Sequence, residues 1–286
     1  MSFQAGYVRL LENNKLAEKA GILQEHLESC MLCPHECAAD RKEEAGFCQS
    51  KDKAIVASYG PHFGEEAVLT GRRGSGTIFF GYCNMRCVYC QNHRLSFSGQ
   101  GTAISDEDLA ELMLEIQNTY RCHNINLVSP THFLVNIVNA VHIAAQKGLH
   151  LPLVYNSSGY ERLEILKILD GIVDIYMPDF KYFHNESAKK LSQIDDYPKR
   201  AKLALREMSR QVGGLKTQNG IAYKGLLVRH LVLPGHSAET KSILNFLKKE
   251  LPADVLINLM DQYYPAHLAY NYDVLNRRLS RTEYEY

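Results

Sequence analysis

TIFFGYCNMRCVYC, residues 77–90, joins a short apolar run to three cysteines that have three and then two residues between them. The run at 77–82 has the length and the β-branched and aromatic composition of a buried strand. Cys83, Cys87 and Cys90 therefore follow a strand directly. Parallel α/β architectures place their chemistry at the carboxyl ends of strands, because the connecting loops meet there at a common mouth. We expect the three thiols to lie at such a mouth.

Apolar runs of this kind alternate with helix-like segments through the rest of the sequence, which predicts repeated βα units and a parallel sheet. The expected strands are TIFFGY (77–82), INLVS (125–129), LPLVYN (151–156), IVDIYMP (172–178), LLVRHLVLP (226–234) and VLINLM (255–260). Six units leave too little chain for two more, so we expect an α/β fold built as a partial (β/α)6 barrel. A doubly wound open sheet is the alternative.

A helix is expected between the first two strands. Ser105 has the side chain of an N-cap and stands directly before three acidic residues, 106–108. The apolar positions that follow recur at helical spacing and predict one buried stripe. This stripe consists of Leu109, Leu112, Met113 and Ile116.

The N-terminal quarter of the chain differs in composition from the rest. Residues 1–28 read as one or two polar-faced helices, and a segment rich in cysteine, proline and charge follows at 30–48. A connection punctuated by glycines leads from there to the first strand. We therefore divide the chain into a helical, four-cysteine N-terminal segment, 1–72, and a barrel domain, 73–286. The apolar positions expected in the first helices are Val8, Leu10, Leu11, Leu16, Ile22, Leu23 and Leu27.

At the other end of the chain, Ser280 and Glu283 have the spacing of a helix start. The sequence stops at Tyr286 after less than two turns, which is short for a stable helix. We therefore expect this sequence to be a truncated form.

The composition of the 286 residues fits a globular enzyme. Lys plus Arg and Asp plus Glu number 32 each, so neither a global positive field nor an acidic excess is present. The N-terminus lacks the apolar core of a signal peptide, and no run approaches the roughly 18 apolar residues of a membrane span. We expect a cytoplasmic protein that binds neither membrane nor nucleic acid. In that compartment the eight cysteines stay reduced and available for metals or catalysis.

Three closely spaced cysteines suit an iron–sulfur cluster with one open iron. A cubane cluster ordinarily takes four cysteines, so three leave one iron free for another ligand, which indicates chemistry rather than structure. The alternatives are a structural zinc loop, for which His93 could supply a fourth ligand, or buried cysteines that merely pack. We favour the cluster because of what the spacing resembles.

The triplet resembles the hallmark of the radical S-adenosylmethionine (SAM) superfamily, CxxxCxxC with an aromatic residue before the last cysteine, here Tyr89. Five stretches, spread over almost the whole chain, are similar to uncharacterised iron–sulfur proteins related to pyruvate formate-lyase activating enzymes. They are GSGTIFFGYCNMRCVYCQN (74–92), NINLVSPTH (124–132), YNSSGYE (155–161), DIYMPDFKY (174–182) and VRHLVLPG (228–235). The resemblance implies a partial barrel of the radical SAM type with a small N-terminal cysteine-rich extension.

The resemblance also implies a [4Fe-4S] cluster on Cys83, Cys87 and Cys90 whose open iron binds the amino and carboxylate groups of SAM. One electron would cleave SAM to methionine and a 5′-deoxyadenosyl radical. That radical would take a hydrogen atom from an unidentified protein or small molecule. An electron donor such as flavodoxin or ferredoxin is implied as a partner. The narrower implication is an activase that places a glycyl radical on a partner enzyme.

Further residues are implied as SAM contacts by their match to the family. Met177, Asp179 and Lys181 match a Met-x-Asp-x-Lys stretch that helps to hold a monovalent cation near the SAM carboxylate. Alternate residues at a strand end project to the same side, so Asp179 and Lys181 can both face the mouth, with an exposed ion pair as the alternative. Arg229 matches an arginine aimed at the cofactor from the fifth strand, and a strand-end salt bridge is its alternative.

Three segments depart from the family pattern. Asn156 and Ser157 stand where activating enzymes have an Asp-Thr pair, so a bound cation would be weaker or absent. The second strand ends in SPTH instead of a Gly-Gly-Glu type segment, so Ser129 and Thr131 would accept hydrogen bonds from the SAM ammonium group without the charge of a carboxylate. Residues 260–263 replace a segment with a histidine, and we expect substrate handling to differ.

Cys30, Cys33, Cys37 and Cys48 form a second cysteine group, with the pattern CxxCPxxC followed by the fourth thiol. Four thiolates make a closed site. A structural zinc is the simplest occupant, and a second iron–sulfur cluster able to relay electrons is the alternative. Cys122 stands alone beside a strand and is expected to be a packed thiol.

A function of another class is a non-catalytic iron–sulfur or metal-binding module for electron transfer. Binding of SAM separates the two hypotheses, and the retained Asp179, Lys181 and Arg229 predict that SAM binds. A zinc-dependent nucleic-acid binder is disfavoured by the neutral net charge and the lack of a basic stripe.

Overall fold

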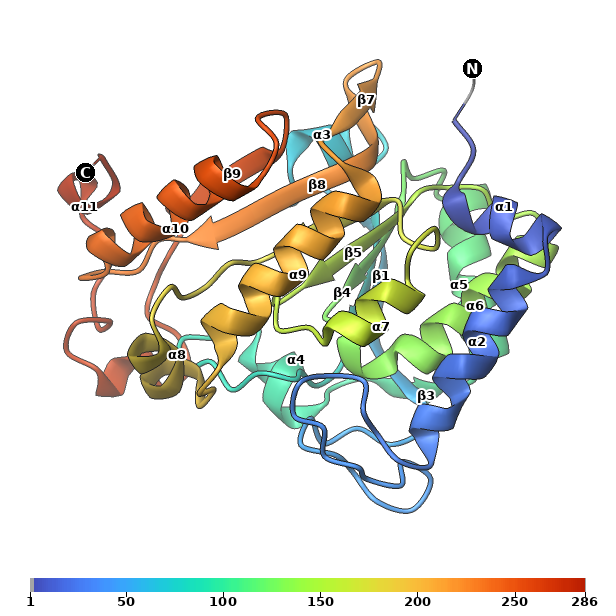
Figure 1. Ribbon diagram of the computed structural model, residues 1–286, viewed down its shortest axis with the longest axis horizontal. Helices are drawn as coiled ribbons and strands as arrows, with labels where there is room; N and C mark the ends of the chain where they lie inside the picture. The colour runs from blue at the N-terminus through green and yellow to red at the C-terminus, as the bar shows by residue number, and fades with distance from the viewer. Residues whose placement is uncertain (1–2, 286) are drawn as a thin grey trace.

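The computed structural model describes residues 3–285, and Met1, Ser2 and Tyr286 lie outside that description. Within it the strands form one nine-stranded sheet, whose parallel members β2, β4, β5, β6, β8 and β9 are neighbours in chain order. A doubly wound sheet reverses its strand order at a switch point. This sheet instead grows at one edge and stays open (Figure 1). The expected α/β fold with an open parallel sheet is confirmed, and the strand order is that of a partial barrel.

All six expected strands are present. They are β2 (Ser75–Phe80), β4 (Ile125–Val128), β5 (Leu153–Ser157), β6 (Ile175–Pro178), β8 (Ile221–Leu231) and β9 (Leu256–Met260). β5 and β6 are wholly buried, because parallel strands in the middle of such a sheet are covered on both faces. That burial is why they read as continuous apolar runs.

Three further strands are not predicted by the sequence. They are β1 (Ala54–His62), β3 (Thr102–Ile104) and β7 (Lys216–Gln218). β1 is antiparallel to β2, β3 pairs with β1, and β7 forms a hairpin with the start of β8. Their residues are partly exposed, so they carry glycine, proline and polar side chains in place of an apolar run.

Helices cover the convex face of the sheet (Figure 1). They are α1 (Gly6–Glu12), α2 (Lys15–Gln24), α3 (Ala67–Thr70), α4 (His93–Ser98), α5 (Asp106–Asn118), α6 (Leu134–Gln146), α7 (Leu163–Ile168), α8 (Asn185–Ser192), α9 (Tyr197–Val212), α10 (Ser237–Glu250) and α11 (Arg281–Glu285). Short 3-10 turns occupy Glu25–Leu27, Thr131–Phe133 and Ala269–Asn271. α3 packs on the concave side, as described below, and α4 borders the cavity at the carboxyl ends of the strands.

The predicted capping of α5 is present. Asp108 donates its backbone N–H to Ser105 Oγ at 3.0 Å, and Ser105 donates its own N–H to Asp108 Oδ2 at 3.3 Å. Each side chain thereby satisfies a backbone donor that the first helical turn leaves free. At the far end, Ser280 and Glu283 exchange bonds of the same kind at the start of α11.

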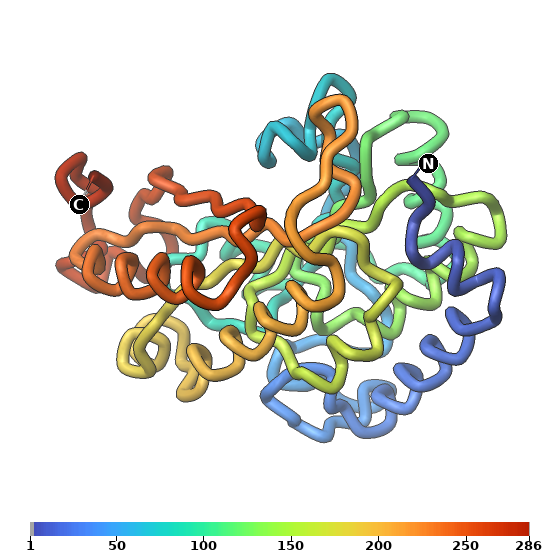
Figure 2. The backbone as a smooth tube through the Cα atoms, turned by 45° about the horizontal axis from the view of Figure 1, so that its top comes forward, coloured from blue at the N-terminus to red at the C-terminus, as the bar shows by residue number. Residues whose placement is uncertain are grey.

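The N-terminal helices form an outer layer. α1 and α2 pack against α6 (Figure 2), and Leu16, Leu23 and Leu27 are buried as expected. Ile22 is 49% exposed, so its expected place in the apolar stripe is wrong. Tyr7 and Ala20 are buried and complete the contact instead: Leu16, Ala20 and Leu23 of α2 follow one another at helical spacing, and Ile22, six residues after Leu16, falls outside that stripe.

The N-terminal segment 1–72 shares the sheet and the core with the rest of the chain. Its residues 54–62 are strand β1, which lies hydrogen-bonded beside β2. Leu16 and Leu23 belong to the same buried cluster as Leu127 and Tyr155 of the barrel. The cysteine-rich loop is therefore attached to a rigid body on both sides.

α3 closes the concave side of the sheet. Leu69 of this helix packs on Val154, Ile175, Met177 and Leu227, which project from β5, β6 and β8. These apolar residues fill part of the barrel interior. The carboxyl ends of the strands stay free for polar side chains.

None of the helices described for residues 3–285 has the length and the apolar character that a membrane crossing needs.

Candidate functional site

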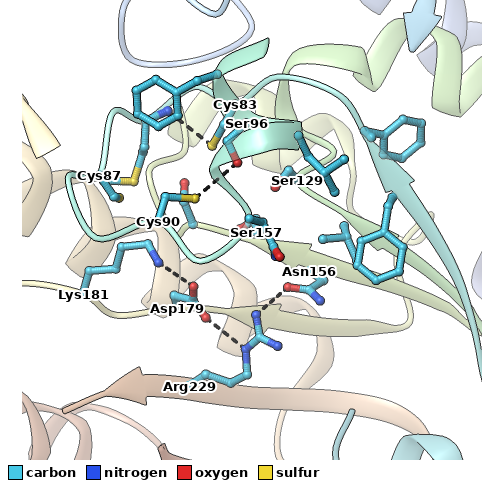
Figure 3. A pocket seen from close by; sticks show the side chains of 18 residues that line it. Cys83, Cys87, Cys90, Ser96, Ser129, Asn156, Ser157, Asp179, Lys181 and Arg229 are labelled. Carbon is cyan, nitrogen blue, oxygen red and sulfur yellow. Dashed lines mark hydrogen bonds and ion pairs between the residues drawn. The ribbon is translucent and has the colours of Figure 1, made fainter. Parts of the chain in front are cut away.

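The three clustered cysteines lie where the sequence predicts, at the carboxyl end of β2. Cys83, Cys87 and Cys90 line one cavity together with residues from the ends of β4, β5, β6 and β8 (Figure 3). Tyr82 and Ser129, which follow β2 and β4, have φ values of 65° and 56°. Residues other than glycine rarely adopt this conformation, and such strain is typical of functional sites.

Hydrogen-bond donors point at the sulfur atoms of this triplet. The backbone N–H of Met85 donates to Cys83 Sγ at 3.4 Å, and the hydroxyl of Ser192 donates to Cys87 Sγ at 3.0 Å. Cys90 Sγ and Ser96 Oγ are 3.4 Å apart. Burial raises the pKa of Cys83 to about 12, so as a free thiol it stays protonated. Binding to a metal reverses this preference, because a coordinating thiol is deprotonated.

The donor set fits an iron–sulfur cluster. Within residues 3–285, no three His, Cys, Asp or Glu side chains are placed as ligands of one common ion. That finding concerns single-ion sites, since the thiolates of a cubane bind different irons. His93, the candidate fourth ligand of a zinc loop, does not line the cavity; its ring stacks on that of His267 with 5.1 Å between centroids.

A row of charged side chains faces the cysteines across the cavity. Asp179, directly after β6, accepts from Lys181 Nζ at 2.6 Å on one oxygen and from Arg229 Nε at 2.9 Å on the other. Burial alone would raise the pKa of Asp179, but the two cations lower it to about 2. The pKa of Lys181 is raised despite its burial, because Asp179 stabilises the ammonium form. All three groups are therefore charged at neutral pH.

Arg229 also holds the amide side chain that precedes the β5 loop. Its Nη2 donates to Asn156 Oδ1 at 2.7 Å, and its Nη1 lies 3.3 Å from Glu65 Oε2 (Figure 3 shows the first contact). The oxygens of Asp179 and Asn156, the two groups expected to hold a monovalent cation, thus both accept from the guanidinium. The positive charge beside these two oxygens is therefore supplied by the side chain of Arg229.

Gly159 allows the β5 loop to lie this close to the end of β6. Its φ is 74°, and a Cβ atom at this position would lie 2.3 Å from the carbonyl oxygen of Asp179. Tyr197 OH donates to that carbonyl oxygen at 2.9 Å and accepts from the backbone N–H of Lys181 at 2.8 Å. Only glycine fits here, and the tyrosine fixes the backbone at Asp179 and Lys181.

Only some of the remaining residues that the sequence predicts as contacts line the cavity. Ser129, Asn156 and Ser157 line the cavity. Thr131 does not, because its hydroxyl donates to the buried Glu161 at 2.8 Å. Met177 projects to the same side as Asp179 but is covered by α3. Tyr89 borders a second hollow that adjoins the first.

That second hollow shares several walls with the cavity. Cys87, Cys90 and the charged row line both. It is bounded in addition by Tyr89, Gln91, Leu231, Met260 and Gln262, so it opens beside β9. Cys87 and Cys90 thus border both spaces.

Several residues of the site are not found by sequence reasoning. Ser96, Ser192 and Glu65 contact motif residues in space but lie outside the quoted motifs in the sequence. Glu161 ends the stretch YNSSGYE. Burial raises the pKa of Glu161 to about 7, and hydrogen bonds from Thr131 and Tyr155 hold the carboxyl in place. The sequence signal for Glu161 is a carboxyl group two residues after Gly159, inside a quoted motif.

The four N-terminal cysteines belong to the loop at 30–48, which lies beside α4 at the bottom of Figure 1. Cys30, Cys33 and Cys48 are buried and Cys37 is exposed. This loop contacts the triplet loop, since His35 and the backbone carbonyl of Asn84 are 2.9 Å apart. Cys122 is buried outside both groups.

Comparison with known proteins gives a match over more than half of the chain. A family model described as the radical SAM superfamily matches residues 77–247. Uncharacterized protein MJ0674 from Methanocaldococcus jannaschii is 30% identical over an alignment that covers 99% of this chain and 80% of that protein.

Solved structures are similar at lower identity. The structure titled "Native anSMEcpe with bound AdoMet and Cp18Cys peptide" has a TM-score of 0.48 and 10% identity, over 71% of this chain and 54% of that one. Streptococcus suis SuiB bound to precursor peptide SuiA has a TM-score of 0.48 and 10% identity, over 72% of this chain and 43% of that one. The chain spans about half the length of these structures or less.

Proposed function

Because this chain belongs to the radical SAM superfamily, we propose that it is an enzyme that cleaves SAM reductively and uses the resulting radical to take a hydrogen atom from a substrate. The observation that carries the proposal is the meeting of three thiols with the row Lys181, Asp179 and Arg229 in one cavity. A purely structural metal site needs no charged cavity beside it. SAM brings a carboxylate, an ammonium and a sulfonium group, which such a row can orient.

Cys83, Cys87 and Cys90 would hold a [4Fe-4S] cluster. When bound, the cluster supplies one electron to SAM, and the products are methionine and the 5′-deoxyadenosyl radical. The Met85 N–H and the Ser192 hydroxyl would stabilise the thiolate form of their cysteines. We place this chemistry in the cytoplasm, where the cysteines, all free thiols, stay reduced.

Arg229 and Lys181 would bind the carboxylate of SAM, while Asp179 keeps both cations in position. Ser129 and Ser157 line the same cavity and would accept hydrogen bonds from the ammonium group. We propose that the guanidinium takes the place of the monovalent cation, because it already occupies the oxygens of Asp179 and Asn156. SAM binding would then need no added metal ion.

The substrate would enter through the hollow beside β9, which reaches the cysteines without passing through the SAM cavity. Gln91 and Gln262 stand at its rim, and glutamine amides pair with peptide groups as donor and acceptor. This favours a polypeptide loop over a charged metabolite. An activase that forms a glycyl radical on a partner enzyme is the narrowest version, and a glycyl radical detected by EPR on a candidate partner would support it.

The alternative is an electron-transfer module that keeps the cluster without cleaving SAM. The two are separated by adding SAM to the anaerobically reconstituted, reduced protein and recording its EPR spectrum. We expect SAM to change the spectrum of the wild type and of the control Cys122→Ala, and to do so only at higher concentration in Arg229→Gln. A spectrum that SAM leaves unchanged at any concentration would favour the module.

A further inference from the structure

We propose that Cys30, Cys33, Cys37 and Cys48 bind a second iron–sulfur cluster, through which an electron from an external carrier reaches the cluster at Cys83, Cys87 and Cys90. The proposal deepens the proposed function and rests on it, because the electron is consumed in cleaving SAM. It is carried by the folding of the cysteine loop, by a buried arginine and by the contacts between the two loops.

Backbone hydrogen bonds fold the N-terminal cysteine loop back on itself. Cys30 and Ala39 form a backbone bond of 3.0 Å, and Ala38 donates back to the carbonyl of Cys30 at 3.0 Å, so the segment folds onto itself. A Cβ atom built on Gly46 would lie 3.0 Å from Cys37 Sγ and 3.8 Å from Cys48 Sγ. Both sulfurs therefore border Gly46, and the lack of a side chain there leaves room for Cys37 Sγ.

Arg41 points to an anionic occupant of this loop. It is 1% exposed, its Nη1 lies 3.5 Å from Cys30 Sγ, and its Nη2 donates to the carbonyls of Lys51 and His132. Its buried Nε has no partner, and within residues 3–285 none of its contacts is a carboxylate. An unpaired buried guanidinium is costly. The thiolates of a metal-bound cysteine group would supply the missing negative charge.

The N-terminal cysteine loop contacts the loop that carries Cys83, Cys87 and Cys90. In both loops the residues that make the contact are close to cysteines in the sequence. His35, between Cys33 and Cys37, lies 2.9 Å from the carbonyl oxygen of Asn84, the residue after Cys83. Arg86, which precedes Cys87, donates to the carbonyl of Phe47 at 2.9 Å. The rings of His35 and Phe47 stack with 3.6 Å between centroids.

These contacts favour an electron-transfer role over a structural zinc. Thiolates bound to a zinc ion would also supply negative charge beside Arg41. Zinc has no redox chemistry, however, and a structural zinc site needs no contact with the loop that carries Cys83, Cys87 and Cys90. Cys37 is the exposed member of the group, so an electron carrier can approach the site from solvent. The triplet is reached from there through the partly buried contacts of His35 and Arg86.

The electron balance is simple. A reduced flavin or iron–sulfur protein gives one electron to the N-terminal cluster, which passes it to the cluster at the triplet. That electron enters SAM, the sulfonium C–S bond breaks, and one methionine and one 5′-deoxyadenosyl radical form. The donor is oxidised by one electron for each SAM that is cleaved.

The first test isolates the N-terminal site in a variant that lacks the triplet, Cys83→Ala with Cys87→Ala and Cys90→Ala. We expect this variant, after anaerobic reconstitution, to hold about four irons and four sulfides per chain, with a reduced EPR signal that SAM does not change. One zinc and no iron would overturn the proposal. Should the variant not fold, the wild type decides, with about eight irons expected and about four contradicting.

The second test measures the relay. Cys37→Ser is compared with Cys122→Ala and the wild type for 5′-deoxyadenosine formation with photoreduced flavodoxin and with dithionite. We expect the flavodoxin-supported rate of Cys37→Ser to fall at least about tenfold while the dithionite-supported rate changes less than about twofold. An equal loss with both reductants would overturn the relay. If the wild type binds no cluster at the triplet at all, the proposed function fails instead.

Discussion

Arg229 donates from Nη2 to Asn156 Oδ1 at 2.7 Å, so a guanidinium on β8 reaches over β6 to the end of β5. The same guanidinium also donates from Nε to Asp179 Oδ1. Three neighbouring strands are thereby joined by one fixed positive charge beside the cysteines.

The first prediction concerns monovalent cations. We expect the rate of SAM cleavage to stay the same when Na⁺ and K⁺ are replaced by an organic cation at constant ionic strength. Arg229→Gln should raise the KM for SAM about tenfold to hundredfold, the usual worth of a charge-assisted bond. The exposed Arg206, changed to Gln, is the matched control. A wild type that needs K⁺ would show that Arg229 does not replace the cation.

The second prediction concerns the reduction potential of the cluster. Ser192 donates to Cys87 Sγ, and a donor stabilises the more negative, reduced cluster. We expect Ser192→Ala to lower the potential by about 20–65 mV, which corresponds to a net hydrogen bond of about 0.5–1.5 kcal/mol. A redox titration followed by EPR without SAM measures this. Ser242→Ala, on the exposed side of α10, should leave the potential unchanged, and an unchanged potential in Ser192→Ala would refute the assignment.

The third prediction concerns pH and the buried Glu161. Its pKa is raised by burial from 4.5 to about 7, so the folded state keeps a proton that the unfolded state has lost. The stabilisation from this group is complete below the unfolded pKa and disappears as pH rises through about 7. Glu161→Gln has no carboxyl group to ionise at this position. Its free energy of unfolding should therefore fall less steeply with pH than that of the wild type, by up to about 1.4 kcal/mol per pH unit. Denaturation of the anaerobic holoprotein between about pH 5 and 8 tests it.

Asp174 is the internal comparison for that experiment. Burial also raises its pKa to about 7, and it accepts from the backbone N–H groups of Gly6 and Leu153. The wild type should therefore lose stability with pH through both groups, and Glu161→Gln should keep the part of the loss that belongs to Asp174. Parallel curves for wild type and Glu161→Gln would mean that Glu161 is ionised in the folded protein.

The fourth prediction separates strain from contact at Gly159. Gly159→Ala should place a methyl group against the carbonyl of Asp179 and weaken SAM binding as well as stability. Gly220 has a similar φ of 79° but nothing within 4 Å of a built Cβ. Gly220→Ala should cost only the backbone strain, about 1–2 kcal/mol, and leave SAM binding unchanged. Equal effects of the two substitutions on SAM affinity would contradict the role given to Gly159.

Much of the fold is predictable from the sequence because its parallel strands are buried on both faces. β5 and β6 are continuous apolar runs for that reason. β1 is not predictable in the same way, since SYGPH near its end is half exposed and its pairing with β2 is long-range. The exposure of Ile22 follows from the position of the buried stripe of α2, Leu16, Ala20 and Leu23, in which the small Ala20 takes the place that an apolar count gives to Ile22.

The site residues also fall into those that strand patterns predict and those that depend on other contacts. The triplet, Asp179, Lys181 and Arg229 sit on strand ends, so strand periodicity places them at one mouth. Thr131 looks equally available in the sequence but pairs with Glu161, because the turn Thr131–Phe133 carries its side chain away from the cavity. Ser192 reaches Cys87 from α8, more than a hundred residues along the chain, and no local pattern reports such a contact.

The most direct test of the central claim is 5′-deoxyadenosine formation from SAM by the anaerobically reconstituted, dithionite-reduced protein, with Cys87→Ala and Cys122→Ala assayed beside it. The account predicts product from the wild type and Cys122→Ala and none from Cys87→Ala, with iron lost only from the last. Product formation and iron content that survive Cys87→Ala would contradict it.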